Sequence, residues 1–505
     1  MDTFNCRTYT TYPLSLAIKF LKSLVNLFTD YVNKSIFRSK ERFTRRIGME
    51  KQGDFERKIG TFQGITINMA QMMGAGPFIT IPLVLSAMGG PQAMFGWVAG
   101  AILALLDGQI WSELGSSLPG EGGTYNYLKA AFYPRTGNLM PFLFIWSVLL
   151  ATPLTLSSGA IGLANYAKFF WPGLTGMQTK LIAVAVTLLA IVLLYRRVTS
   201  VTKISLVLWL GMILTVVLIV VTGMLHFDPK LAFDFPKGAF APNKFFMGLG
   251  AGMLLSIYDY LGYYTSAYMG DELKTPGKTI PRSITLSILF VALIDLSMNI
   301  GIIGFVPWRV AAKSANVGSL FMTKAWGPVG GAVITILIIW TCFASVYTGL
   351  LGASRIPYNA AKDGVFFKQF AHLHPKLKFP NYSLLVIGGI MVICCFFDLT
   401  TVINALMAVQ IVVQFLMQII ALSVLRKRRP TLKRPYKELL YPLPSILAFI
   451  GWTFVFVSSG TSAITLAVVW MVLGILVFLG RSFIVKNDWP FKRPAPQRED
   501  HHGNA

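Results

Sequence analysis

Residues 62–82, FQGITINMAQMMGAGPFITIP, form an apolar segment with a break near its middle. The break is Gly-Ala-Gly-Pro at 74–77, where Pro77 lacks a backbone N–H and clashes, inside a helix, with the carbonyl four residues earlier. The glycines on either side tolerate non-helical backbone angles. The segment is therefore predicted to form a half-helix, a few extended residues and a second half-helix that starts near Pro77.

A second segment of the same kind follows. Residues 248–272 read GLGAGMLLSIYDYLGYYTSAYMGDE, with a glycine-rich start and a polar cluster around Asp259 at mid-span. It is the sixth apolar segment, and this odd offset from the first inverts the second unit in the membrane. Two interrupted helices in corresponding positions are typical of inverted-repeat transporters, whose site lies at the bilayer midplane. A packing kink between closely approaching helices is the alternative for either break.

The composition indicates a polytopic membrane protein. Of 505 residues, 54% are apolar and only 13% are charged, against roughly 25% in soluble domains. Stretches of about 20 apolar residues recur along the chain, which excludes soluble enzymes, secreted disulfide scaffolds and disordered proteins. Twelve membrane-spanning helices are predicted, at 59–85, 93–116, 139–168, 179–196, 203–226, 243–270, 283–306, 328–350, 382–398, 401–425, 440–459 and 461–482.

The net charge of +24 is explained by topology. With the N-terminus in the cytoplasm, 37 of the 45 Lys and Arg residues fall in cytoplasmic segments, as the positive-inside rule requires. Both termini are therefore predicted to be cytoplasmic, in a multi-pass protein of the cell membrane. The lipid bilayer is the expected partner of this charge, and no nucleic acid is expected.

Residues 12–33 have the pattern of a basic amphipathic helix, which would lie on the inner leaflet. Their lysines interrupt the apolar stretch too often for a signal peptide. The alternative is that Met49 is the true start and residues 1–48 are not translated.

Broken helices offer backbone groups for binding. Freed N–H groups at a half-helix N-terminus place a positive dipole end where a carboxylate can bind. Freed carbonyls at the opposing half-helix C-terminus suit an ammonium group. A zwitterionic amino acid presents both groups, so such a solute is the expected ligand.

Asp259 stands out because a carboxylate at membrane depth costs several kcal/mol unless it is paired or hydrated. Three roles are open: a counter-charge for a cationic substrate, a proton-binding coupling site, or a structural cap on the broken helix. Asp107 and Asp295 are weaker candidates for coupling. No metal site is expected, because no group of His, Cys, Asp or Glu has ligand spacing. Cys394 and Cys395 are expected to be buried thiols.

Four motifs, in order, resemble those of the amino acid–polyamine–organocation superfamily. They are GAGPFI at 74–79, SELGSSLPGEGGTY at 112–125, YDYLGY at 258–263 with GDELKTPGKTIPR at 270–282, and SRIPYNAAKDG at 354–364. The resemblance covers about residues 55–480. It implies an all-α, five-plus-five inverted-repeat core with broken first and sixth helices and two extra C-terminal helices. The implied units are 1–58 (cytoplasmic), 59–226 (first repeat), 243–425 (second repeat), 440–482 (extra helices) and 483–505 (cytoplasmic tail).

Two features bear on the subfamily. Val207-Leu-Trp209, in the fifth helix, is similar to the Val-Gly-Trp of plant polyamine uptake transporters. Asp259 resembles the Asp that those proteins and the cystine/cationic amino-acid exchangers carry in the sixth helix, so the resemblance is to polyamine uptake transporters and to L-type or cationic amino acid transporters. Proton-coupled relatives place a Lys near position 209, where this chain has Trp209. The light chains of heteromeric exchangers carry a Cys after the third helix, whereas residues 171–177 of this chain contain none. No disulfide-linked heavy chain is therefore expected.

The resemblance and the physical argument point to the same site. Backbone groups of Ala75, Gly76 and Phe78 are predicted to bind the carboxylate, with Gly74 giving access. Carbonyls near Asn68 and Met72 and around 255–258 are predicted to bind the amine. The full set of predicted substrate-binding residues is Asn68, Met72, Gly74, Ala75, Gly76, Phe78, Trp146, Ser256, Ile257, Tyr258, Asp259, Tyr260, Tyr263 and Tyr347.

The predicted function is secondary active transport of amino acids, cationic ones included, or of polyamines, by alternating access. No phosphate-binding GxxxxGK[ST] loop is present, so an ion gradient or exchange would supply the energy. No cofactor is expected, and an enzyme is not expected because no His lies inside the predicted bundle. A membrane-bound amino-acid sensor that does not transport is the alternative function.

Overall fold

Helices build the part of the chain that the structure describes. The structure is a computed model that describes residues 57, 59–120, 122–195, 198–375 and 379–484, with only the backbone for 198–210 and 484. All of these belong to one unit, Glu56–Ala505. The predicted amphipathic helix at 12–33, nearly all of the predicted segments 1–58 and 483–505, and the side chains of Val207 and Trp209 lie outside the described residues.

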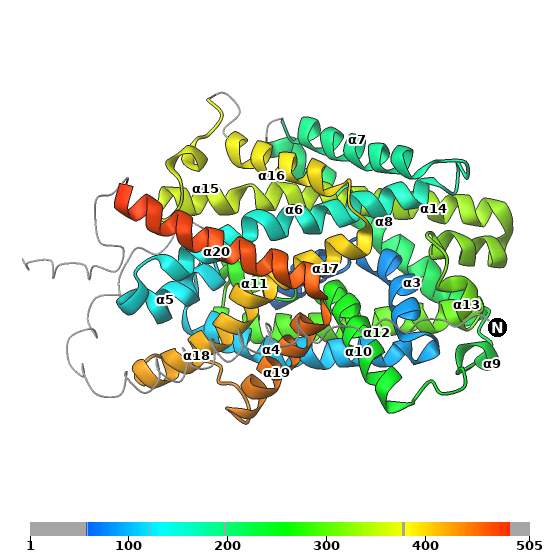
Figure 1. Ribbon diagram of the computed structural model, residues 1–505, viewed down its shortest axis with the longest axis horizontal. Coiled ribbons are helices and arrows are strands. Elements are labelled where there is room, and N and C mark those ends of the chain that lie inside the picture. Colours follow the sequence, from blue (N-terminus) through cyan, green and yellow to red (C-terminus); the bar gives the residue numbers. More distant parts are fainter. Residues whose placement is uncertain (1–56, 58, 121, 196–197, 376–378, 485–505) are drawn as a thin grey trace, which may run out of the picture. The chain divides into compact units, whose positions relative to one another are not determined.

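Figure 1 shows the arrangement of these helices. The first half of the chain forms α2 (Thr61–Met72), α3 (Gly76–Met88), α4 (Met94–Ser117), α5 (Thr124–Thr136), α6 (Leu139–Ala167), α7 (Gly176–Leu194), α8 (Val198–Leu225), α9 (Pro229–Ala232) and α10 (Pro242–Tyr260). The second half forms α11 (Thr265–Tyr268), α12 (Pro276–Ile303), α13 (Trp308–Ala311), α14 (Val317–Ala353), α15 (Arg355–Lys362), α16 (Asn381–Cys394), α17 (Leu399–Gln410), α18 (Met417–Arg428), α19 (Leu443–Ser458) and α20 (Thr461–Ile484). Short 3₁₀ turns lie at Pro91–Ala93, Gly270–Glu272 and Lys368–Ala371, and a π-helical turn, Ile411–Leu416, joins α17 to α18.

Each of the twelve predicted segments coincides with a helix or a pair of helices. Seven helical stretches of the described chain are long and apolar enough to cross a membrane, one of them made of α17, the π-helical turn and α18, and α2 with α3 makes an eighth span bent by 53°. Large apolar side chains are exposed along α7 and α20, as expected for lipid-facing helices. The chain is therefore an integral membrane protein, and the number of twelve spans stays a prediction.

The first predicted break is confirmed, with a different local conformation. α2 ends at Met72 and α3 begins at Gly76, with Pro77 in its first turn, where a missing N–H leaves no bond unmade. The intervening residues are not extended: Met73 has φ −84° and ψ 42°, and Ala75 is helical at φ −72° and ψ −18°. Local bonds from Met73 N to Met69 O (2.8 Å) and from Phe78 N to Ala75 O (3.2 Å) hold the break as a tight turn instead.

The second predicted break is confirmed just after Asp259. α10 ends at Tyr260, and the chain turns through 261–264 before the single turn of α11. Gly262 has φ +110°, a backbone conformation that residues other than glycine rarely adopt. The glycine of the YDYLGY motif therefore permits this turn.

Long-range packing brings the broken segments together. α12 packs on α4 and α2, while α10 packs on both α3 and α4. α6 contacts α14 and α17, and α17 also contacts α20. In Figure 1, α5 and the end of α18 lie at one end of the helices, and α9 and α13 lie at the other. These are called the α5 end and the α9 end below.

Candidate solute-binding site at two helix breaks

Asp259 lies against the first turn of α3. A methyl group at Gly76 would overlap the carboxyl group, since its β-carbon would lie 3.2 Å from the carboxyl carbon and closer still to Oδ1. Thr80 donates its hydroxyl to Oδ2 of Asp259 at 2.6 Å. A carboxylate beside a helix N-terminus is favoured by the helix dipole. The end of α10 is thus fastened to the start of α3.

The reverse contact joins the second break to the end of α2. A β-carbon at Gly262 would lie 2.9 Å from Cβ of Gln71 and 3.2 Å from its carbonyl carbon. Only a residue without a side chain fits there. Each break therefore presents a glycine to the other interrupted segment.

Asn68 connects the same two segments by hydrogen bonds. Its Oδ1 accepts from the backbone N–H of Ser266 in α11 at 2.7 Å. Its Nδ2 donates to Oγ of Ser287 in α12 at 3.4 Å. Because Asn68 is fully buried, it satisfies an N–H of α11 that water does not reach.

Side chains of α6 and α14 complete the surroundings of the breaks. The hydroxyl groups of Tyr258 and Ser158 are 2.6 Å apart. Tyr166 donates to the carbonyl of Phe78 at 2.9 Å. A β-carbon at Gly74 would lie 2.6 Å from Oγ of Ser345, so α14 closely approaches the first break.

Three buried carboxyl groups lie in or beside this region. Oδ1 of Asp259 and both carboxyl oxygens of Asp295 have no hydrogen-bond partner, and Asp107 accepts from the hydroxyl of Tyr263. Asp295 lies close enough to Asp259 to interact with it electrostatically. Within the described part of the chain, none of the three forms an ion pair. The region therefore offers carboxyl oxygens that a cation or a proton can neutralise.

The comparison with protein families decides the identity. Residues 59–482 match the family model described as amino acid permease. The chain belongs to this family of amino acid permeases.

Several curated relatives align with most of the permease. It is 26% identical to the serine/threonine exchanger SteT of Bacillus subtilis (strain 168), over 79% of this chain and 90% of that protein. It is 22% identical to the branched-chain amino acid permease BcaP of the same organism, over 88% and 97%. It is 28% identical to the Asc-type amino acid transporter 1 of Mus musculus, over 80% and 76%. All three are transporters by name, and none is an enzyme.

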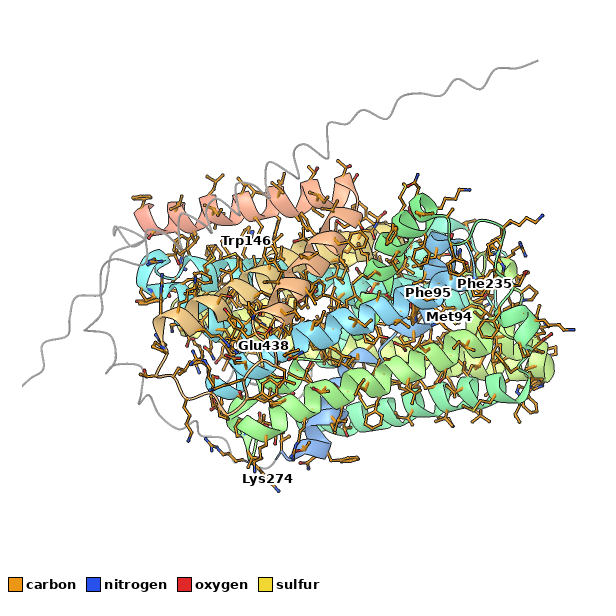
Figure 2. The ribbon with its side chains drawn as sticks, turned by 90° about the horizontal axis from the view of Figure 1, so that it is seen from below. Met94, Phe95, Trp146, Phe235, Lys274 and Glu438 are labelled. Atoms are coloured by element: carbon orange, nitrogen blue, oxygen red, sulfur yellow. The ribbon has the colours of Figure 1, made fainter. Side chains whose placement is uncertain are left out.

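Three of the predicted site residues have side chains committed to contacts elsewhere in the permease. Trp146 lies beside α20 (Figure 2): its ring stacks on Trp470 at 4.7 Å, and each indole N–H donates to the other residue's carbonyl, at 2.8 and 2.9 Å. Ser256 donates to the carbonyl of Gly96 in α4 at 2.8 Å. Tyr260 donates to the carbonyl of Trp97 at 3.3 Å. The structure does not turn these side chains toward the breaks.

The other predicted residues are buried at or near the breaks. Tyr263, in the second break, reaches Asp107 in α4. Tyr347, in α14, stacks on Phe343 with ring centroids 6.1 Å apart. The remaining buried residues of the predicted set are Met72, Ala75, Phe78 and Ile257. The predicted cysteine thiols are confirmed as free and buried at Cys394 and Cys395.

Sequence reasoning missed the partners of the broken helices in the permease. Thr80, Ser158 and Tyr166 bond to residues of the two breaks, yet each is a single polar residue in an apolar run. None of the three gave a signal in the sequence that pointed to its partner.

Proposed function

We propose that this permease is a secondary active transporter that binds the amine of an amino acid or polyamine at the two helix breaks and releases it by alternating access. The observation that carries the proposal is the meeting of the two breaks, with Asp259 of one against Gly76 of the other. Non-helical backbone at membrane depth is tolerated where it is buried in protein or lines a water-filled cavity. An interface made of two interrupted segments can separate on one side or the other without breaking a continuous helix.

The position of Asp259 supports amine binding. Its Oδ2 is bonded to Thr80, whereas Oδ1 has no partner and remains available. The carboxylate already occupies the first turn of α3, where the backbone of Ala75, Gly76 and Phe78 was expected to receive a substrate carboxylate. A second anion there would be repelled, so an ammonium group is the better complement.

Cationic substrates are favoured over neutral ones by the second carboxyl group. Asp295 adds a further unpaired acid near Asp259, and the described residues supply no cationic side chain to either. An arginine-like or polyamine solute would bring two positive groups into this acidic region. Two relatives are named as a serine/threonine exchanger and a branched-chain amino acid permease, which supports amino acids as the substrate class.

The test is uptake by Asp259→Asn in proteoliposomes. We expect uptake of arginine and putrescine to fall about tenfold or more, about 1.4 kcal/mol, and uptake of serine and leucine to fall far less. Equal losses for both groups would remove the role of counter-charge. Asp398→Asn, at an exposed residue before α17, is the matched control and should transport normally.

The same preparation separates transport from sensing. A thermal-shift screen of the wild-type protein against amino acids and polyamines identifies ligands, because a ligand that binds the folded state raises its apparent stability. Accumulation or exchange of those ligands in proteoliposomes supports a transporter. Saturable binding without either would favour a sensor.

A further inference from the structure

Three glutamines follow one face of the tenth predicted span. Gln410, Gln414 and Gln418 are spaced by four residues, which places them on one side of a helix. Gln414 and Gln418 are buried. The π-helical turn Ile411–Leu416 lies within the row, and such turns occur frequently at functional sites.

Hydrogen bonds link this row to the segment after the second break. Gln410 donates from Nε2 to the hydroxyl of Tyr264 at 3.0 Å and to Oε1 of Gln414 at 2.9 Å. Tyr264 ends the turn in which α10 is interrupted, and its ring stacks on Trp111 at 4.4 Å. The Gln410 end of the row therefore lies at the second break.

The Gln418 end of the row reaches α5. Thr124, the first residue of α5, donates to Oε1 of Gln418 at 2.6 Å, and its hydroxyl lies 3.3 Å from that of Tyr268. Tyr268 is the last residue of α11. Two hydrogen-bonded groups of polar side chains thus lie along the row: Gln410 and Gln414 with Tyr264 at the second break, and Gln418 with Thr124 at the start of α5.

Gln418 leaves one donor unused. Its Nε2 has no partner, although the residue is fully buried. An unpaired buried donor costs about 1–3 kcal/mol in folded proteins, so it stands out among these otherwise bonded side chains. An amide N–H is a natural donor to the carboxylate of a small solute.

We propose that Gln410, Gln414 and Gln418 line the route by which the solute passes between the two breaks and the α5 end, and that Gln418 binds the solute carboxylate on the way. The inference rests on the proposed transport function and adds a second, transient site to it. Opening the route requires Tyr264 and Thr124 to exchange their bonds with the glutamines for bonds with the solute. The π-helical turn is a point where α17 and α18 can bend for this purpose.

The first test is Gln418→Leu in the full-length protein. We expect the concentration of a transported amino acid that gives a half-maximal thermal shift to stay within about twofold of the wild-type value. Uptake of the same amino acid should fall about tenfold. Gln369→Leu, at an exposed glutamine outside the row, is the matched control. If Gln418→Leu does not fold, Gln418→Met, with an unbranched side chain of similar length, replaces it.

The second test measures access to the row. Gln418→Cys, in a Cys6→Ser background, is labelled with a small water-soluble thiol reagent. The native cysteines that the structure describes, Cys342, Cys394 and Cys395, are buried. We expect labelling to become about fivefold faster during turnover than without solute, as expected when a solute shifts the population of an open state. The inference would be overturned if turnover left the labelling rate of Gln418→Cys unchanged. It would also be overturned if Gln418→Leu left uptake unchanged, or if it reduced binding and uptake equally. A wild-type protein that binds no amino acid would instead overturn the proposed function itself.

Discussion

At the residue scale, Gly76 leaves no room for a side chain. Its missing side chain leaves the place that the carboxyl group of Asp259 fills, and Thr80 holds that group from the next turn of α3. A larger residue would push Asp259 away from α3 and remove both the helix-dipole contact and the hydrogen bond. If the proposed site is correct, substrate affinity and the contact between the two breaks depend on the same atoms.

The predicted consequence is that Gly76→Val strongly weakens solute binding. We expect the apparent dissociation constant in a ligand thermal-shift titration to rise by about tenfold or more. Gly389→Ala, in α16, is the control, because a β-carbon there meets no atom within 4 Å. Normal affinity in the Gly76→Val protein would count against the site.

Glycine and proline made the breaks predictable, because their backbone effects are local and need no partner. Asp259 was predictable as a special residue because its energetic cost at membrane depth does not depend on the fold. The direction of Trp146 was not predictable: α6 is apolar on all sides, and only the position of α20 decides which face points where. Thr80 gave no signal until Asp259 was placed beside it.

At the element scale, the linker between α18 and α19 is folded onto the end of α4. Glu113 of α4 is buried and accepts two hydrogen bonds from Arg426, and Oε1 also lies 3.2 Å from Nε of Arg434. The backbone N–H of Glu438 donates to Glu113 at 2.7 Å. Figure 2 labels Glu438 in this linker. No local sequence pattern pointed to these partners of Glu113, because Arg426 lies 313 positions away along the chain.

The carboxyl group of Glu438 makes this linker sensitive to pH. Ser445, in the first turn of α19, donates its backbone N–H to Oε1 at 2.7 Å and its hydroxyl to both carboxyl oxygens. Burial raises the pKa of the Glu438 carboxyl above its ordinary value, against the lowering effects of Ser445 and of Arg426; the charge of Glu113 adds to the increase. The folded state therefore holds this proton more tightly than the unfolded state does.

The prediction is that Glu438→Gln flattens the pH dependence of stability. The stabilising contribution of wild-type Glu438 is fully present below the ordinary glutamate pKa and is lost as pH rises through the raised folded-state value. Gln does not titrate, so the Tm of the variant relative to wild type should rise as the pH increases above the ordinary glutamate pKa. Tm measurements on the purified protein in detergent check this. Parallel Tm profiles for the two proteins would show that Glu438 does not titrate differently in the folded state.

At the scale of the whole molecule, the helices were predictable because a membrane span must satisfy its own backbone hydrogen bonds, so each apolar segment is helical whatever it packs against. The pairing of helices was not predictable from residues alone. α6 meets α14, α17 and α20 through side chains that are apolar in all four helices, and apolar surfaces match one another without specificity. The family resemblance, and not the hydropathy pattern, carried the expectation of an inverted repeat.

The charge distribution of the whole molecule predicts its orientation. The α5 end carries Arg426, Arg428 and Arg434, with the basic linker that follows α18, so the positive-inside rule places this end in the cytoplasm. The test introduces one cysteine at an exposed lysine, Lys437→Cys near the α5 end or Lys237→Cys near the α9 end, in a Cys6→Ser background that keeps only the buried Cys342, Cys394 and Cys395. A membrane-impermeant maleimide added to intact cells should label Lys237→Cys and leave Lys437→Cys unlabelled until the cells are permeabilised. The reverse pattern would invert the molecule, and the glutamine row would then lead to the outside.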